Sequence, residues 1–172
     1  LVVASDRHRG HAPLAEIESS GLQPPFEHPG RADAIHDTLA SDQRFSLVEP
    51  TTWDTTPIEA VHDPGLVGFL ERAWGDYQVR HPGTHDVVPD VFAMPGLVAG
   101  VGEFPERSVV DHELGRWCFE TTTPITQGTY DAARSAVDIA LTSADAVVAG
   151  QAAVYGLCRP PGHHAPTGLY GG

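Results

Sequence analysis

The sequence has little positive charge and no lysine: its ten basic residues are all arginines, against 23 aspartates and glutamates. The formal net charge at pH 7 is −13. A nucleic-acid partner needs clustered positive charge to bind its phosphates, so this composition argues against that class of partner. Such acidity is compatible with a cationic substrate, but surface acidity most often serves solubility.

Cysteine and long apolar runs are also scarce. Cys118 and Cys158 are the only cysteines, which is too few for a disulfide framework in a chain of this length. The apolar opening, residues 1–4, is far shorter than the core of a signal peptide or a membrane span. We therefore expect a cytoplasmic protein that has no membrane partner.

The apolar residues that are present, 41% of the 172-residue chain, are enough for one ordinary domain with a core. Short apolar runs predict buried strands at residues 1–4 and 152–158. Apolar residues at helical spacing predict helices over residues 29–40, 63–74 and 128–150. The second of these is predicted to start with Asp63 as its N-cap and Pro64 directly after it. Strands alternating with helices are typical of an α/β layered fold.

Two details of this prediction can be checked against a structure. On the last predicted helix, apolar residues repeat at intervals of three and four and predict one buried face, which comprises Tyr130, Ala133, Val137, Leu141 and Ala144. Residues 76–115 are rich in Gly, Pro, His and Asp, so we expect mostly loop there. A loop of that length in a compact domain indicates a functional segment.

The segment RPPGHH follows the second predicted strand and is the main candidate for chemistry. Pro160 and Pro161 stiffen the chain as it leaves the sheet, and Gly162 permits an unusual turn. His163 and His164 then lie at the carboxyl end of a strand, where ligands collect in α/β folds. Histidine is the side chain best suited to move protons near pH 7. From the residues alone, two ordinary surface histidines remain an open alternative.

Several segments together resemble one family. LCRPPGHHA resembles the signature of the histone deacetylase superfamily, particularly the acetylpolyamine amidohydrolases and the bacterial histone deacetylase-like amidohydrolases. PPFEHPGRADAI, VHDPGLVGFLERAW and PITQGTYDAARSAVDIAL are similar to family segments in the same order. The resemblance covers nearly the whole chain and implies an arginase- and deacetylase-like three-layer α/β fold around a central parallel sheet.

The resemblance also implies roles for individual residues. His164 would be the general base that accepts a proton from water, and His163 would orient that water and stabilise the charged transition state. Each would be held by an aspartate further along the chain. Gly172 matches a glycine whose backbone lines the acyl channel. Arg31 matches an arginine beside an internal cavity linked to acetate release.

Substrate choice is less clear from the resemblance. Acetylpolyamine enzymes of the family use carboxylates to bind a distal ammonium, and Asp111, Glu113 and Glu120 lie in the matching region. Of these, Asp111 and Glu120 are the predicted site residues. Where one such family glutamate is expected, this sequence has Thr122. A small acetylated amine and an acetyl-lysine peptide are therefore both open as substrates.

The reaction that the resemblance implies is the hydrolysis of an acetylated amine to the free amine and acetate by a zinc-dependent enzyme. The family's zinc ligands follow the histidine motif, so we expect Zn²⁺ to be bound by residues downstream of Gly172 and none of its ligands to lie in this chain. Residues 1–172 would then be the N-terminal portion of a single deacetylase domain, with an incomplete sheet and no activity alone. We also expect a homodimer, because a family insertion in this region often supports dimerisation.

Two alternatives change the class of protein. One is a non-catalytic binding member of the family that lacks the metal site. The other is a hydrolase in which Cys158 is a nucleophile beside His163, but a thiol at the end of an apolar strand is usually buried packing.

Overall fold

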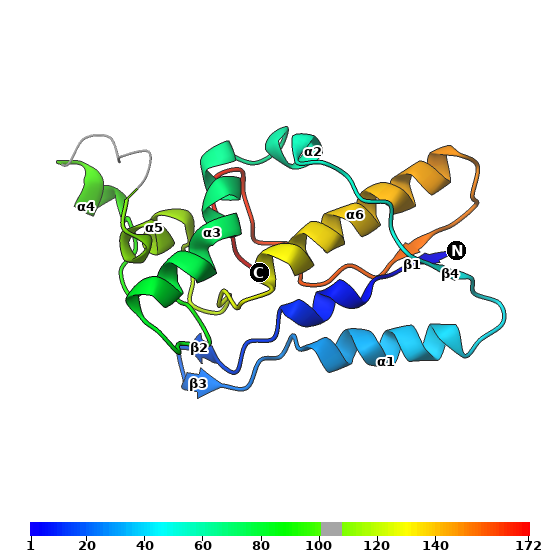
Figure 1. Cartoon of the computed structure of the whole chain (residues 1–172), viewed down its shortest axis with the longest axis horizontal. Helices are drawn as coiled ribbons and strands as arrows, with labels where there is room; N and C mark the ends of the chain where they lie inside the picture. Colours follow the sequence, from blue (N-terminus) through cyan, green and yellow to red (C-terminus); the bar gives the residue numbers. More distant parts are fainter. Residues whose placement is uncertain (101–107) are drawn as a thin grey trace. The chain divides into compact units, whose positions relative to one another are not determined.

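The computed structural model of the chain describes residues 1–100 and 108–172, which divide into two compact units (Figure 1). Unit 1 consists of Leu1–Ala12, Pro25–Pro57 and Gln127–Pro161. Unit 2 consists of Pro13–Pro24, Ile58–Thr126 and Gly162–Gly172, apart from residues 101–107. No helix in the described ranges is both long and apolar enough to cross a membrane.

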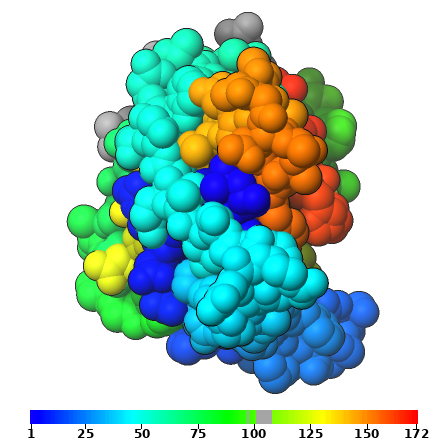
Figure 2. Space-filling view, turned by 90° about the vertical axis from the view of Figure 1, so that its right-hand side faces the viewer, coloured from blue at the N-terminus to red at the C-terminus, as the bar shows by residue number. Residues whose placement is uncertain are grey.

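Unit 1 is built on a parallel three-stranded sheet. Strand β1 (Val2–Val3) pairs on one side with β4 (Leu47–Val48) and on the other with β5 (Tyr155–Gly156). In Figure 2 the dark-blue start of the chain lies between the cyan segment that includes β4 and the orange segment that leads into β5. Val2 and Val3 are fully buried, which confirms the strand predicted at residues 1–4.

The helices of unit 1 are η1 (Asp6–Gly10), α1 (Pro29–Ala40) and α6 (Thr129–Val148). Helices α1 and α6 confirm the two predicted helices in this unit, and α6 packs along β1 and β5 (Figure 1). The start of α6 also packs against η1, because Gly10 and Gly128 let their backbones meet. A Cβ on Gly128 would lie only 2.6 Å from the Cα of Gly10, so this approach requires glycine.

The buried face predicted for α6 is wrong. The residues that are buried are Ala132, Ser135, Asp138 and Ile139. Leu141 is only half-buried, and Ala144 is exposed. The reason is a polar contact: Asp138 accepts a hydrogen bond from the backbone N–H of Trp53 (3.0 Å), and Arg134 donates to the Trp53 carbonyl (2.7 Å). The helix thus turns polar groups toward the rest of unit 1, and apolar periodicity alone could not identify its buried face.

The strand predicted at residues 152–158 is shorter and more exposed than expected. Only β5 pairs as a strand, and in the described part of the chain it has β1 alone as its neighbour. Ala152, Ala153 and Tyr155 are exposed, so continuous burial of this run was a wrong expectation. Cys158, expected to be buried, is also exposed, and its thiol donates to the Ala136 carbonyl (3.4 Å).

Unit 2 contains an antiparallel pair of strands, β2 (Glu16–Glu18) and β3 (Gly21–Gln23), together with helices that are joined by long irregular segments. The short helix α2 (Thr56–Glu59) precedes α3 (Pro64–Arg80). The Asp63 carboxylate accepts from the Gly65 N–H (2.7 Å) and caps α3, with Pro64 in the first turn. This confirms the predicted start of the helix, which continues beyond its predicted end at residue 74.

Helix α4 (Pro95–Val98) and most of helix α5 (Val110–Trp117) lie in the stretch predicted to be mostly loop. That prediction is therefore wrong for these segments and for the end of α3, and residues 101–107 of it lie outside the described residues. Helix α5 was not predicted from the sequence, because one of its buried positions is a glutamate, Glu113, which interrupts the apolar pattern.

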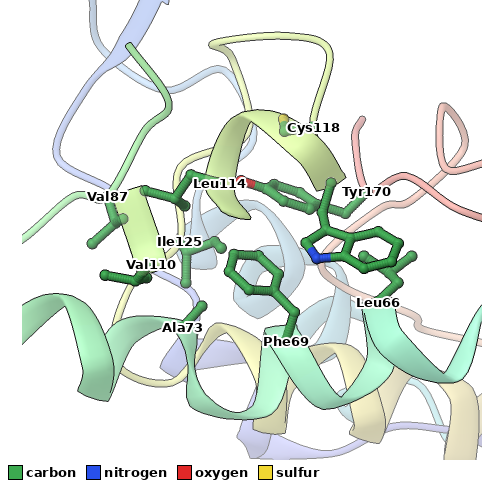
Figure 3. Close-up of a cluster of buried hydrophobic side chains, with 10 residues drawn as sticks. Leu66, Phe69, Ala73, Val87, Val110, Leu114, Cys118, Ile125 and Tyr170 are labelled. Carbon is green, nitrogen blue, oxygen red and sulfur yellow. The ribbon is translucent and has the colours of Figure 1, made fainter. Parts of the chain in front are cut away.

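The core of unit 2 lies between α3 and α5 (Figure 3). Leu66, Phe69 and Ala73 of α3 pack against Leu114 of α5. The cluster is completed by Val87, Val110, Trp117, Cys118, Ile125 and Tyr170. Tyr170 stacks on Phe69 with 6.5 Å between ring centroids, so the end of the chain is anchored in this core.

A buried ion pair joins the two helices beside this core. The side chain of Glu113 is 1% exposed, forms an ion pair with Arg72 and accepts from the Ser108 N–H (2.6 Å). Arg72 also donates to Asp76 (2.8 Å) on its own helix. A buried carboxylate without its cation is strongly unfavourable, so the α3–α5 contact depends on Arg72.

Replacing Arg72 by alanine should lower the free energy of unfolding of the complete protein by about 3 kcal/mol, because Glu113 stays buried without its cation. The measurement is urea unfolding. Arg44→Ala is the matched control: Arg44 is 83% exposed and pairs with Asp42, so its loss should cost less than about 1 kcal/mol. Equal losses for the two variants would contradict the role given to the buried pair.

Candidate active site

The candidate site in unit 2 begins with a backbone pairing. Cys118 and Tyr170 form a parallel bridge, and the Tyr170 N–H donates to the Trp117 carbonyl (2.8 Å). Parallel pairing advances equally along both segments. Glu120 and Gly172, each two residues further on, therefore come together, and the Gly172 N–H donates to Oε1 of Glu120 (2.6 Å).

The histidine pair lies on a turn that is tied to the rest of unit 2. The Ala165 N–H donates to the Gly162 carbonyl (3.0 Å) around the turn. Beyond it, the Asp63 N–H donates to the Thr167 carbonyl (2.8 Å). The rings of His163 and His164 lie edge to face, with 4.2 Å between their centroids. Both side chains are exposed, so solvent can reach them.

One carboxylate connects these two parts of the site. Oε2 of Glu120 lies 3.1 Å from Nδ1 of His164, while Oε1 accepts from the Thr123 hydroxyl (2.5 Å) as well as from Gly172. Partial burial works to raise the pKa of Glu120, but the hydrogen bonds from Thr123, Gly172 and His164 outweigh it, and the pKa lies below its usual value. Glu120 is therefore an anion at neutral pH.

Gly172 fits against the histidine turn only because it lacks a side chain. Its φ is +90°, in the region that favours glycine, and a Cβ there would lie 2.8 Å from the backbone nitrogen of His164. The backbone of residue 172 is thus in direct contact with the histidine turn.

The chain that carries this arrangement is similar to a known protein family. The model of the histone deacetylase domain matches residues 25–172. The chain belongs to the histone deacetylase domain family. The predicted resemblance is therefore confirmed.

Several curated relatives of the chain are named acetylpolyamine amidohydrolases. Acetylpolyamine amidohydrolase 2 of Pseudomonas aeruginosa is 34% identical over 172 residues, which are 100% of this chain and 48% of that protein. Acetylpolyamine amidohydrolase 1 of the same organism is 36% identical over 174 residues, 100% of this chain and 49% of that protein. The chain spans about half the length of the curated relatives that it matches.

A solved structure extends the likeness to three dimensions. The acetylpolyamine aminohydrolase from Burkholderia pseudomallei superimposes with a TM-score of 0.86 at 27% identity, over 99% of this chain and 48% of that one. The predicted deacetylase-like α/β fold with its parallel sheet is therefore confirmed, and this chain corresponds to about half of it.

The structure brings four of the six predicted site residues together: His163, His164, Gly172 and Glu120. Asp111, also in unit 2, does not join them. Its carboxylate binds Arg80 and His81, each at 2.5 Å. Partial burial raises the pKa of Asp111, but these two hydrogen bonds outweigh it and the net pKa is lowered.

Arg31, the sixth predicted residue, belongs to unit 1. It donates to Glu27 (2.6 Å), whose other carboxylate oxygen accepts from Arg159 (2.8 Å). Arg159 is 1% exposed and also donates to the carbonyls of His8 (2.6 Å) and His11 (2.7 Å). Arg31 thus forms part of a network of charges around a buried arginine.

Sequence reasoning missed three residues with clear roles in these contacts. Arg159 opens the RPPGHH motif, so its position in that motif was an available signal. Asp63 was identified only as a helix cap, although its N–H also holds the histidine turn. Thr123 lies in a run of threonines and polar residues that gives no indication of its bond to Glu120.

Among the residues that the structure describes, no group of three or more His, Cys, Asp or Glu side chains is placed to hold a metal ion. The described residues therefore do not fit a zinc centre by themselves.

Substituting Gly172 by alanine should destabilise the complete protein by at least about 1 kcal/mol, because a positive φ and a close backbone contact both oppose a Cβ. It should also shift the amide NMR signals of His163 and His164. Gly75→Ala is the control: a Cβ there meets no atom within 4 Å, and in helix α3 it should stabilise by up to about 1 kcal/mol. Unchanged histidine signals in Gly172→Ala would contradict the packing described here.

Acidification should weaken this site, because the pKa of Glu120 is lower in the folded protein than its usual value of 4.5. A carboxyl group with a lowered folded pKa contributes stability that is present above its unfolded pKa and is lost as the pH falls through its folded pKa. The free energy of unfolding of the wild type should therefore fall more steeply than that of Glu120→Gln between about pH 6 and about pH 3. Denaturant unfolding at a series of pH values tests this, and parallel curves would refute it.

Proposed function

We propose that the complete protein is a zinc-dependent deacetylase that hydrolyses an acetylated amine to the free amine and acetate. The observation that carries the proposal is the paired histidines of a histone deacetylase family chain, with Glu120 and Gly172 held against them. The relatives named acetylpolyamine amidohydrolases support a small acetylated amine as the substrate.

We infer the zinc ion from the family to which the chain belongs, because the described residues alone do not form a metal site. When bound, a zinc ion would polarise the acetyl carbonyl and activate water. Its ligands are proposed to come from the protein outside these 172 residues, since the described side chains do not provide a set.

The histidine pair supplies the proton transfer. Water adds to the acetyl carbonyl carbon as His164 accepts its proton, and the C–N bond then breaks as the departing amine takes up a proton. His163, whose ring contacts that of His164, orients the water and stabilises the charge that develops. Gly172 lines the acyl channel with backbone, and Arg31 assists the departure of acetate.

The proposed substrates include more than acetylated polyamines, because neither candidate carboxylate is left without hydrogen bonds from the protein. Asp111 and Glu120, the carboxylates proposed to bind a distal ammonium, both already accept hydrogen bonds from protein groups. A site specialised for polyamines would leave a carboxylate oxygen for the ligand. Acetylated polyamines and acetyl-lysine peptides therefore both belong in the test.

His164→Ala in the complete protein should lower kcat for acetylputrescine or an acetyl-lysine peptide by at least about 100-fold, as expected for loss of a general base. Release of acetate measures the activity. His36→Ala is the control and should keep wild-type activity, because His36 is a half-buried histidine of α1 that pairs with Asp37. Near-full activity in His164→Ala would overturn the assignment. A wild type that binds these amines without releasing acetate would instead indicate a non-catalytic binding member of the family.

A further inference from the structure

We infer that His62 is a positioning residue, which holds the backbone just beyond the histidine pair. Its ring Nδ1 lies 3.2 Å from the Pro166 carbonyl oxygen, and the next residue, Asp63, donates its N–H to the Thr167 carbonyl (2.8 Å). Two adjacent residues thus hold two adjacent carbonyls. This role concerns the backbone alone and leaves the rings of the pair to the aspartates expected further along the chain. Its kinetic consequence rests on the proposed function, whereas its structural consequence does not.

The first argument concerns the proton on the His62 ring. A carbonyl oxygen can only accept hydrogen bonds, so Nδ1 must carry a proton to bind Pro166. The neutral ring is therefore the Nδ1–H tautomer, with its lone pair on Nε2, and the protonated ring carries the same Nδ1–H. The bond is thus available in both charge states of His62.

The second argument is that the His62 backbone is itself fixed. Its N–H donates to the Ile58 carbonyl (2.8 Å), which closes the turn after α2. Directly after it, the Asp63 carboxylate caps α3 through the Gly65 N–H, and the Asp63 carbonyl accepts from the Val67 N–H (3.1 Å). Because α3 packs into the core of unit 2, His62 has a firm position from which to hold Pro166, although its side chain is only half-buried.

The third argument is the place of the two carbonyls in the chain. The histidine turn, residues 162–165, is closed by its own hydrogen bond, and further along the Tyr170 N–H donates to the Trp117 carbonyl. Pro166 and Thr167 lie between these two fixed points. Proline has no N–H, so the carbonyl is the backbone group by which Pro166 can be held. His62 therefore ties the backbone that carries the histidine pair to the start of α3.

Two substitutions separate this bond from the mere presence of a polar side chain. In asparagine the side-chain nitrogen is bonded to Cγ, as Nδ1 is in histidine, so His62→Asn can still donate to the Pro166 carbonyl. In glutamine the nitrogen is one atom further along, as Nε2 is, so His62→Gln should lose the bond. His36→Gln is the matched control, because His36 is also half-buried and its Nδ1 also lies 3.2 Å from an acceptor, Oδ1 of Asp37. Thermal unfolding checks that the variants fold.

The first readout is ¹⁵N NMR of the histidine rings in the complete protein at about pH 8.5, where histidines are neutral. The His62 signals are identified by their loss in His62→Asn. We expect a proton on Nδ1 and none on Nε2. A ring protonated at Nε2 would overturn the inference, and the wild-type spectrum decides this even if His62→Gln fails to fold.

The second readout is amide hydrogen exchange, measured by mass spectrometry on peptides that cover residues 162–172. Exchange there should be at least about threefold faster in His62→Gln than in the wild type, and close to wild type in His62→Asn and His36→Gln. Peptides from α6 should exchange as in the wild type, because faster exchange there would mean general destabilisation and would overturn the inference. Equal exchange of residues 162–172 in His62→Asn and His62→Gln would also contradict the role given to the Nδ1–H.

The third readout is the release of acetate from acetylputrescine and an acetyl-lysine peptide. Because the Asp63 bond remains, His62→Gln should lower kcat by about 3- to 10-fold with KM within about twofold of wild type, and His62→Asn and His36→Gln should change neither. An unchanged kcat in His62→Gln would overturn the inference, and a raised KM beside it would make His62 a substrate-binding residue. If the wild type releases no acetate from either probe, the proposed function fails, and the ring NMR and the hydrogen exchange then decide whether His62 positions this backbone.

Discussion

The parallel pairing of Cys118 with Tyr170 is the constraint on which the candidate site depends. Tyr170 is fixed because its ring is buried against Phe69, and Cys118 is fixed because it directly follows helix α5. The register of this pairing places Glu120 opposite Gly172. From there, one carboxylate reaches the ring of His164. The packing of unit 2 thus determines where Glu120 and Gly172 lie relative to its histidine pair.

Each unit contains a buried charged side chain, Glu113 in unit 2 and Arg159 in unit 1. Groups of opposite charge or hydrogen-bonding backbone groups surround both. Glu113 binds Arg72 and the Ser108 N–H, and this pair ties α5, and hence Cys118, to α3. In unit 1, Arg159 is surrounded by Glu27 and by backbone carbonyls. A buried ion is tolerated only with such partners, so these groups specify contacts that apolar packing alone would leave free. The RPPGHH motif begins at one of these fixed charges.

The local signals in the sequence predicted the long helices and the first strand, but they missed helix α5 and gave no information on the contacts between elements. Helix α3 was predicted from the Asp63–Pro64 start, and the strand at Val2–Val3 from its apolar residues, because caps and short apolar runs act locally. The buried face of α6 was predicted wrongly, because Asp138 is buried through a bond to the backbone of Trp53. His163, His164 and Gly172 were identified from a motif. The contact between Glu120 and His164 could not be predicted, because it depends on a pairing between segments far apart in the sequence, for which no local pattern exists.

Following the oxygen atom of water shows whether the complete protein hydrolyses acetylated amines as proposed. The complete protein is incubated with acetylputrescine in H₂¹⁸O, and the products are analysed by mass spectrometry. We expect equal amounts of putrescine and acetate, with one solvent oxygen in each acetate. The absence of both products, or acetate without a solvent oxygen, would contradict it.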